Sequence, residues 1–399
     1  MSKVIFVSLM LLLASCSLGE ISNSNKSLVG VPDVRSSASN LPPGPERLAR
    51  LRKGINLSNW FAQGKSGDLE HVKTFITEAD IRKIKSMGFT HVRLPIDPTY
   101  FLDENNPGGI NPDYLTQLDR AIATIVANDL AVIVDLHHPG DGFRQKLAHD
   151  DSFVVAIENF WRSLAKHYAS YDPNLLFFEV LNEPAFTYMF ADRQTAVKRW
   201  ASVQERLVKA IRQSAPQHTL IVTDADFGNI EHLRQMPLLA DKNVIYNIHF
   251  YEPMVFTHQR ADWIERFKDL QDIPYPFSSQ ACQSNLPQLK AESRGAIAWY
   301  CKENWGKAQL EKEIAQLAVW QKEHNAKLVV TEFGVYKLTP ASYRLNWIGD
   351  VRSLFEKYDI GWTMWEYSGG FGLTKEGERE RSIDLEVAEA LGLKGGDRK

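Results

Sequence analysis

The chain is predicted to fold as a closed (β/α)₈ TIM barrel, an α/β fold, over a single large domain. Three observations predict it: eight short apolar runs rich in β-branched residues, an amphipathic stretch after each run, and polar residues where the runs end. Near-continuous apolar strands are typical of parallel sheets that are buried on both faces. An open doubly wound sheet is the alternative. It often has a glycine-rich phosphate turn after its first strand, and residues 54–58 (GINLS) are not such a turn.

Each expected strand is a run of four to seven mostly apolar residues, as in AVIVDLH over 131–137. In chain order the expected strands are 53–58, 91–97, 131–137, 175–181, 219–223, 244–250, 328–331 and 361–365.

Each expected helix has apolar residues three and four positions apart, as at Leu115, Leu118, Ile122 and Ile125. The expected helices are 78–87, 113–128, 153–168, 194–213, a short piece near Ile230, 310–323, 345–358 and 383–391. The sixth follows an insertion at about 254–305, which is long for a βα loop and is expected to shape substrate subsites. It carries Trp263, Tyr275, Phe277, Trp299, Tyr300 and Trp305.

The composition excludes several classes of protein. The 399 residues hold 46 Lys and Arg against 49 Asp and Glu, so there is no basic excess for a nucleic-acid partner. Hydrophobic residues make up 44%, which is ordinary for a folded domain rather than a disordered chain. Three cysteines are too few for a disulfide framework or a zinc cluster to dominate.

Residues 1–15 are expected to be a signal peptide, because Lys3 precedes an apolar run, 4–14, that is too short to span a bilayer. The run ends in LASC, which resembles the lipobox of bacterial lipoproteins and implies a lipid on Cys16. An ordinary signal peptide that contains a cysteine is the alternative. Residues 16–46, rich in Ser, Asn, Gly and Pro, are expected to be a flexible tether. The catalytic domain would then be 47–399, exported and lipid-anchored in the cell envelope, at the outer membrane or cell surface.

Polar side chains stand at the carboxyl ends of the expected strands, where barrel enzymes place their active sites. Two of them, Glu183 and Glu332, end the fourth and seventh strands and would face each other across the barrel mouth. Cleavage of a glycosidic bond requires such a pair, with one carboxyl group protonated and the other ionised.

Residues 181–184 (LNEP) and 331–334 (TEFG) look like the acid/base and nucleophile signatures of the clan A glycoside hydrolases. The wider set resembles glycoside hydrolase family 5, which includes many cellulases and mannanases, over about residues 50–393. That family's pattern is matched here by Arg93, His137, Asn182, Glu183, His249, Tyr251, Glu332 and Trp365.

The resemblance and the chemistry together imply a role for each carboxylate. Glu183 would be the general acid and then the general base, and Glu332 the nucleophile that forms a covalent glycosyl-enzyme. Arg93 and Tyr251 would hydrogen-bond to Glu332, which favours its ionised form.

The remaining matched residues are expected to bind substrate. Asn182 would bond to the sugar 2-hydroxyl, and His137 and His249 would donate to sugar hydroxyls or orient the carboxylates. Trp365 would be the apolar floor under the reacting sugar.

These residues predict a retaining, endo-acting β-glycoside hydrolase, with endo-β-1,4-glucanase preferred on family frequency. Mannanase, xyloglucanase and β-1,3-glucanase remain alternatives, as does a non-catalytic surface glycan-binding protein. The expected partner is a polysaccharide, with no cofactor and a monomeric chain. A metal-dependent barrel hydrolase, prompted by Asp135 and three histidines including His138, is disfavoured because the chain has no His-x-His motif.

Some residues allow two interpretations. Four aromatic residues would either line sugar subsites or pack in the core: Trp60, Phe61, Phe227 and Trp362. Glu179 is interpreted as a buried polar group of the lower barrel.

Two cysteines, Cys282 and Cys301, lie within the insertion, and export would place them in an oxidising compartment. We expect them to form a disulfide that constrains a substrate-facing segment without regular structure of its own. Two buried free thiols are the alternative.

Overall fold

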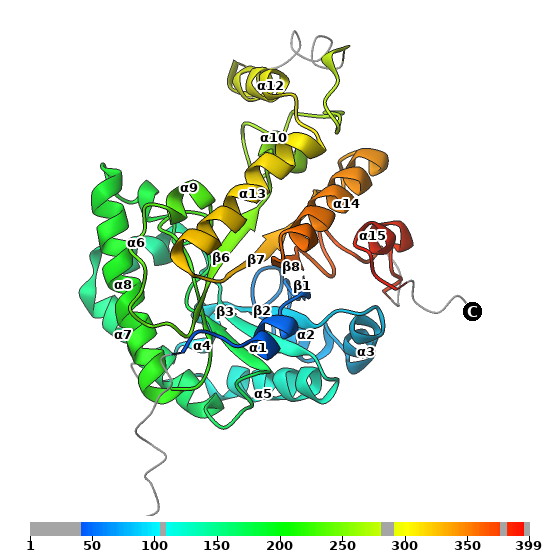
Figure 1. Cartoon of the computed structure of the whole chain (residues 1–399). Helices are drawn as coiled ribbons and strands as arrows, with labels where there is room; N and C mark the ends of the chain where they lie inside the picture. The colour runs from blue at the N-terminus through cyan, green and yellow to red at the C-terminus, as the bar shows by residue number, and fades with distance from the viewer. Residues whose placement is uncertain (1–40, 104–108, 281–290, 376–380, 395–399) are drawn as a thin grey trace, which may run out of the picture. The chain divides into compact units, whose positions relative to one another are not determined.

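The computed structural model is a closed barrel of eight parallel strands in sequential order, as predicted, and β8 closes the sheet against β1 (Figure 1). The structure describes residues 41–103, 109–280, 291–375 and 381–394. The strands are β1 (Lys53–Asn56), β2 (His91–Ile96), β3 (Ala131–Leu136), β4 (Leu176–Glu179), β5 (Leu220–Val222), β6 (Val244–Phe250), β7 (Leu328–Phe333) and β8 (Gly361–Met364).

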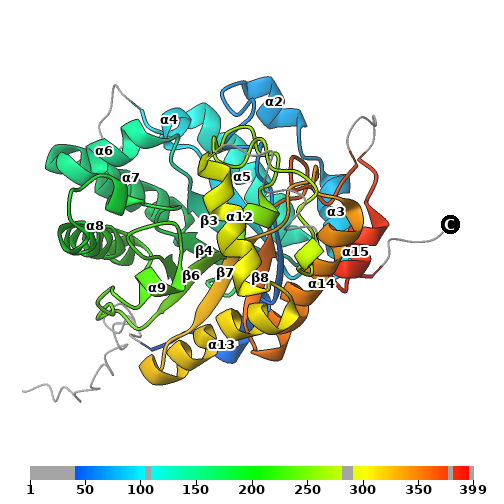
Figure 2. The same cartoon turned by 90° about the horizontal axis from the view of Figure 1, so that it is seen from above.

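Seen from above, helices surround the strands (Figure 2). The described helices are α1 (Pro45–Arg50), α2 (Leu69–Thr74), α3 (Glu78–Ser86), α4 (Pro98–Phe101), α5 (Pro112–Ala127), α6 (Asp141–His149), α7 (Asp151–Tyr168), η1 (Phe186–Tyr188), α8 (Arg193–Ser214), α9 (Ile230–Leu233), α10 (Met254–Thr257), α12 (Ala291–Glu303), α13 (Lys307–His324), α14 (Ala341–Lys357) and α15 (Leu385–Ala390). Within the described ranges, no helix has both the length and the apolar character needed to cross a bilayer.

Residues 1–40 lie outside the described residues. The predicted signal peptide, the lipid on Cys16 and most of the tether therefore stay predictions. Helix α1 begins at Pro45, two residues before the expected start of the domain. Its Arg47 guanidinium donates to Asn174 and Thr219, which attaches the helix to the amino-terminal end of the barrel.

The two faces of each strand bury different side chains. Every second side chain of a strand packs against the helices, as Val132 and Val134 of β3 do. The others face the barrel interior, where an apolar layer consists of Leu51, Ala131, Ile133, Phe177, Ile221, Ile245 and Val329. Two residues further along the same strands, the interior becomes polar, with Asp135 after Ile133 and Glu179 after Phe177. We call these the apolar layer and the polar layer.

The insertion between β6 and α13 has more regular structure than the sequence predicts, because α10 and α12 lie within it. In Figure 1 both helices lie beyond the carboxyl end of β6. Gln259 exchanges hydrogen bonds with the Ile273 backbone, and Tyr275 donates to Asp350 of α14. The prediction that this segment lacks regular structure is therefore wrong. The segment contains helices and is stabilised by its own hydrogen bonds. Cys301 of α12 is disulfide-bonded; Cys282 lies outside the described residues, so their pairing stays a prediction.

Candidate active site

The glutamate of the seventh strand, Glu332, points into the barrel interior, and both of its carboxylate oxygens accept hydrogen bonds. Arg93 Nη1 donates to Oε1 at 2.8 Å and Tyr251 Oη donates to Oε2 at 2.9 Å. These are the two contacts that the sequence predicts. A guanidinium and a phenol on opposite oxygens fix the direction of the carboxylate and suit its ionised form.

A local irregularity of β7 explains why Glu332 faces inward. Thr331 already turns its hydroxyl into the interior, so strict alternation would direct Glu332 outward. The pairing with β6 steps from Ile248–Val330 to His249–Glu332 and leaves Thr331 unpaired. Such a bulge re-aims the side chain that follows it, which here is Glu332.

Glu183 follows β4 on a sharply turned backbone, with φ of 33° at Glu183 and 49° at Ala185. Its Oε1 lies 2.8 Å from His249 Nδ1, and His138 Nε2 lies 3.0 Å from its backbone carbonyl oxygen. About a quarter (27%) of the side chain is exposed. Burial of the remainder raises the pKa of Glu183 to about 7, against the opposing effect of His137.

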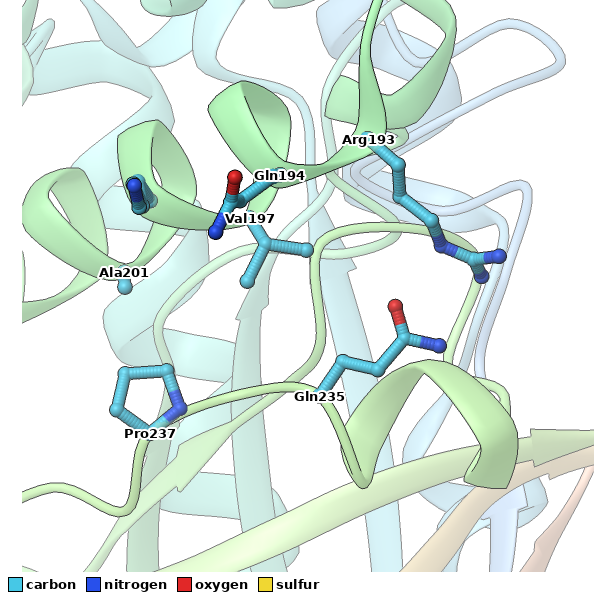
Figure 3. Close-up of a pocket in the computed structure, with 7 residues that line it drawn as sticks. Arg193, Gln194, Val197, Ala201, Gln235 and Pro237 are labelled. Atoms are coloured by element: carbon cyan, nitrogen blue, oxygen red, sulfur yellow. The ribbon is translucent and has the colours of Figure 1, made fainter.

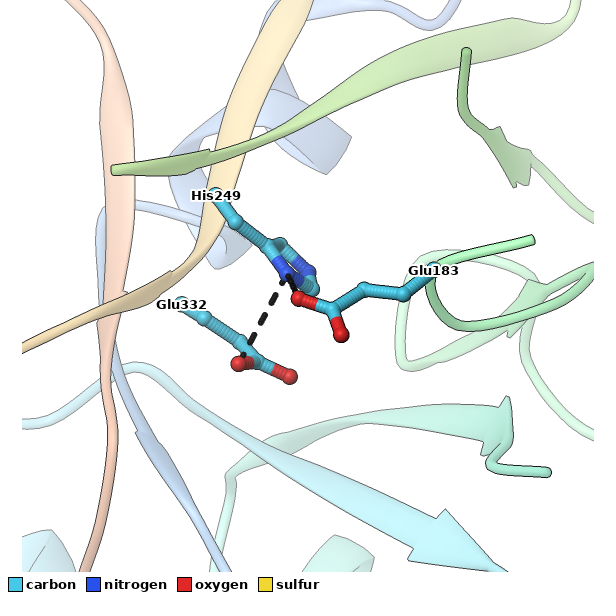
Figure 4. Close-up of side chains that lie close together, drawn as sticks. All are labelled: Glu183, His249 and Glu332. Atoms are coloured by element: carbon cyan, nitrogen blue, oxygen red, sulfur yellow. Dashed lines mark hydrogen bonds and ion pairs between the residues drawn. The ribbon is translucent and has the colours of Figure 1, made fainter. Parts of the chain in front are cut away.

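The two glutamates meet beside His249 (Figure 4). One oxygen of Glu183, one oxygen of Glu332 and one ring nitrogen of His249 all lie within 4.8 Å of one another. A metal ion could occupy such a spacing, but Arg93 and Tyr251 already occupy both oxygens of Glu332. A cation would also lie close to the Arg93 guanidinium, so the donor set favours a pair of carboxylates over a metal centre.

Three hydrogen-bond contacts bear on which ring nitrogen of His249 carries its proton. Burial lowers the pKa of His249 to about 4, so the ring is neutral and has one N–H. The Thr331 hydroxyl donates to Asn247 Oδ1 at 2.5 Å, so its contact with His249 Nε2 at 3.1 Å requires the ring proton on Nε2. Asn247 Nδ2 also lies within hydrogen-bond distance of Nε2, at 3.3 Å, and would donate to it in the other ring tautomer. In the tautomer with the proton on Nε2, Nδ1 accepts a hydrogen bond from a protonated Glu183.

Arg93 is the centre of the polar layer and is fully buried. Its guanidinium forms a two-point pair with Glu179 at 2.7 and 2.8 Å, and lies 3.0 Å from Asp135 and 2.8 Å from Glu332. Burial alone would lower the pKa of Arg93, but the three carboxylates hold it well above its ordinary value. Burial raises the pKa of Asp135 to about 7 and also raises that of Glu179. One guanidinium thus faces three carboxyl groups.

The expected substrate-binding residues line the same mouth. The His137 ring lies against Trp365, with ring centroids 5.8 Å apart and planes 16° apart, and its Nδ1 lies 2.9 Å from Asp135. Burial lowers the pKa of His137. Asn182 Oδ1 accepts from Arg93 Nη2 at 2.8 Å, which leaves its amide nitrogen as the group that can donate to a ligand.

The structure adds a third carboxyl group to this mouth, Glu366, which sequence reasoning did not single out. Ser58 and Asn59, which follow β1, donate to one of its oxygens and the Phe371 backbone N–H donates to the other. Burial raises the pKa of Glu366 to about 7. The sequence offers one signal for Glu366, because this residue directly follows Trp365.

The aromatic residues for which the sequence allowed either a subsite or a core role differ in their burial. Trp60, Phe61 and Trp362 are buried, and Trp362 packs edge-on against Phe333. Phe227 is partly exposed. Within the insertion, Trp263 and Trp299 are the large exposed aromatics of the described part, whereas Tyr275, Tyr300 and Trp305 are buried.

A separate hollow of about 600 Å³ lies between α8 and the segment after α9 (Figure 3). Its lining is Arg193, Gln194, Val197, Lys198, Ala201, Gln235 and Pro237. None of the predicted site residues is among them, and no carboxyl group lines it. The hollow therefore lacks the groups that hydrolytic chemistry requires.

A (β/α)₈ barrel with facing carboxyl groups at the carboxyl ends of β4 and β7, one with a raised pKa and one held by a guanidinium, has the site of a glycoside hydrolase. Residues 54–370 match the cellulase family, glycosyl hydrolase family 5, and the chain belongs to that family.

Relatives and solved structures agree with this assignment. The chain is 30% identical over 326 residues to Endoglucanase C of Acetivibrio thermocellus, which covers 80% of this chain and 92% of the relative. It is 27% identical over 370 residues to Endoglucanase 3 of Fibrobacter succinogenes, and the match covers 88% of this chain and 54% of the relative. The endoglucanase Cel5A of Thermotoga maritima superposes with a TM-score of 0.70 at 25% identity, and the match covers 87% of this chain and 98% of the Cel5A chain. Cel5A has been solved with cellobiose and with mannotriose.

Proposed function

We propose that this protein is a retaining endo-β-1,4-glucanase that cleaves β-glucan chains by double displacement. The observation behind the proposal is the spacing of Glu183 and Glu332, whose nearest oxygens lie within 4.8 Å. Inverting enzymes hold their carboxyl groups roughly 6.5–9.5 Å apart to admit a water, whereas retaining enzymes hold them about 5–5.5 Å apart.

In the first step, the ionised Glu332 attacks the anomeric carbon and Glu183 gives its proton to the departing glycosidic oxygen. In the second step, Glu183, now ionised, takes a proton from water as that water displaces Glu332 from the anomeric carbon. With the ring proton of His249 on Nε2, the starting state has the proton on Glu183, while both oxygens of Glu332 accept hydrogen bonds. Asn182 has an amide N–H that can donate to the 2-hydroxyl, an interaction that strengthens in the transition state.

The glucan preference is supported by the names of the relatives, several of which are endoglucanases. Mannan is the second candidate, because a neighbouring structure holds mannotriose. A panel of soluble glucans, mannans and xyloglucan, with product sizes measured by chromatography, separates these substrates and distinguishes endo from exo cleavage.

The stereochemical test is independent of the substrate preference. Proton NMR recorded immediately after cleavage is expected to show the β anomer before mutarotation. The α anomer as the first product would contradict double displacement, and the absence of turnover on every polysaccharide would favour a glycan-binding protein.

We also propose that the enzyme is exported and lipid-anchored through Cys16. The support is the LASC sequence at 13–16 and the polar tether that follows it. A Cys16→Ser variant expressed in a bacterial host is expected to leave the membrane fraction, and continued membrane association would contradict the anchor.

A further inference from the structure

The loop after β5, residues 224–228, is attached to the acid-bearing loop and to β6. Ala185, two residues after Glu183, donates its backbone N–H to the Asp226 carbonyl oxygen at 3.1 Å. The backbone N–H of His249 donates to Gly228 at 2.9 Å. This loop therefore lies against the loop that carries the acid/base residue.

A pair of titratable side chains lies on this loop, outside the groups that the mechanism uses. Asp226 is 5% exposed, and its Oδ2 lies 2.5 Å from Nδ1 of His232 on α9. The two atoms are at ion-pair distance but are not aligned as a hydrogen bond. Asp226 Oδ1 is buried and has no hydrogen-bond partner among the described residues. Asp226 is thus a buried carboxyl group with one unpaired oxygen among the described residues.

The neighbours of Asp226 explain how its charge is balanced. Its backbone N–H donates to Oδ1 of the buried Asp224, and burial raises the pKa of Asp224 to about 7. The His232 side chain is 20% exposed. His232 is the one basic side chain that the structure places at ion-pair distance from the Asp226 carboxylate in the described part of the chain.

Asp226 opposes the positive groups that face Glu183. After burial, the main influences on the pKa of Glu183 are His137, Arg93 and Arg144, which lower it, and Asp226, which raises it. The other titratable groups around Glu183 are His249, Tyr251, Glu332, Asp135 and His138. Of the groups named here, only Asp226 lies on the loop after β5, where it pairs with His232 of α9.

We propose that Asp226 and His232 are a positioning pair for the acid/base residue, in which the Asp226 carboxylate favours the proton-bearing form of Glu183 and His232 limits that effect. The inference rests on the proposed role of Glu183. Neither residue touches the reacting atoms, so both act through Glu183 alone.

Substitution of either residue is expected to move the alkaline limb of the kcat/KM–pH profile, and the two substitutions are expected to move it in opposite directions. Asp226→Asn removes a negative charge and is expected to move the limb to lower pH by about 0.5–1 unit, the size of one charge at several ångströms. His232→Gln leaves Asp226 uncompensated and is expected to move the limb to higher pH. The double variant should match Asp226→Asn, because His232 acts only through that carboxylate.

Glu231→Gln is the matched control, because it removes an exposed carboxylate next to His232 and should leave the profile unchanged. Titration of the Glu183 carboxyl by infrared difference spectroscopy, with Glu183→Gln as reference, follows the same shift without substrate. Opposite shifts in both measurements support the pair.

The two proposals fail in different ways. An unmoved Glu183 titration in Asp226→Asn, or shifts of the same sign in both variants, overturns the pair. Should Asp226→Asn fold poorly, His232→Gln at the more exposed position tests the sign by itself. Opposite infrared shifts in a protein that cleaves no polysaccharide would support the pair and overturn the proposed function instead.

Discussion

The apolar and polar layers of the barrel interior are two residues apart on the same strands, yet they differ in almost every physical respect. In the apolar layer, Ile133, Phe177 and Ile245 pack against one another and contribute chiefly through burial. In the polar layer, Asp135 and Glu179 converge on the single guanidinium of Arg93. The same strands thus stabilise the barrel at one depth and hold costly buried charge at the next.

The largest effect expected from the polar side is catalytic. Glu332→Gln keeps the shape of the side chain but removes the nucleophile, so kcat on a soluble β-glucan is expected to fall at least about 10³-fold. Arg93 keeps its pairs with Asp135 and Glu179, so the melting temperature should change little. Activity within tenfold of the wild type would contradict the assignment of Glu332.

Arg93→Met would break the polar layer itself. Three buried carboxyl groups would lose their common cation, and the free energy of unfolding is expected to fall by about 3–5 kcal/mol. The carboxyl pKa values of Asp135 and Glu179 are already raised by burial. Their charged forms therefore destabilise the fold as pH rises toward 7 and above, and the loss should be smaller at low pH.

Arg50→Met at the other end of the barrel is the control for Arg93→Met. Its partner Asp129 is mostly exposed, so the expected loss is at most about 1 kcal/mol. Urea unfolding at two pH values measures both variants. Equal losses, or a loss at Arg93 that does not depend on pH, would contradict the charged interpretation of the polar layer.

The pH profile tests the proton on Glu183 without any substitution. A general acid must be protonated, and burial raises the pKa of Glu183 to about 7. Because protonated Glu183 becomes scarce above that pH, kcat/KM is expected to fall about tenfold per pH unit on the alkaline side. A profile that stays flat to well above neutral pH would remove Glu183 from the acid role.

The smallest expected effect belongs to the apolar layer. Ile133→Val removes one methyl group between packed neighbours and is expected to cost about 1 kcal/mol in the free energy of unfolding. Since Ile133 is one layer below the charged groups, kcat per folded molecule should not change. A lowered kcat in this variant would show that the layers are coupled.

The sequence was sufficient to predict the barrel and the contacts of Glu332, because both depend on features that repeat along the chain. Apolar runs mark strands, and the carboxyl ends of parallel strands meet at one face. Arg93 and Tyr251 follow from that rule together with the family resemblance.

Other features depend on geometry that no single run encodes. The bulge at Thr331 that turns Glu332 inward adds one residue to one strand, and nothing in VVTEF announces it. The convergence of Asp135 and Glu179 on Arg93 depends on closure of the barrel. Until the barrel closes, the alternation of side chains along a strand does not show which set faces inward. Helix α6 (Asp141–His149) was missed because a short segment with few apolar residues resembles a loop.

The surplus of carboxyl groups around Arg93 has a consequence for inhibition. A site in which one guanidinium faces Asp135, Glu179 and Glu332 has net negative charge when these groups are ionised, so it disfavours anions and favours an ammonium group that can hydrogen-bond to the carboxylates. Sugar mimics with a basic nitrogen in place of the ring oxygen or anomeric carbon would therefore gain affinity as the surrounding carboxyl groups ionise. Their potency should increase with pH for as long as the inhibitor's own amine keeps its proton.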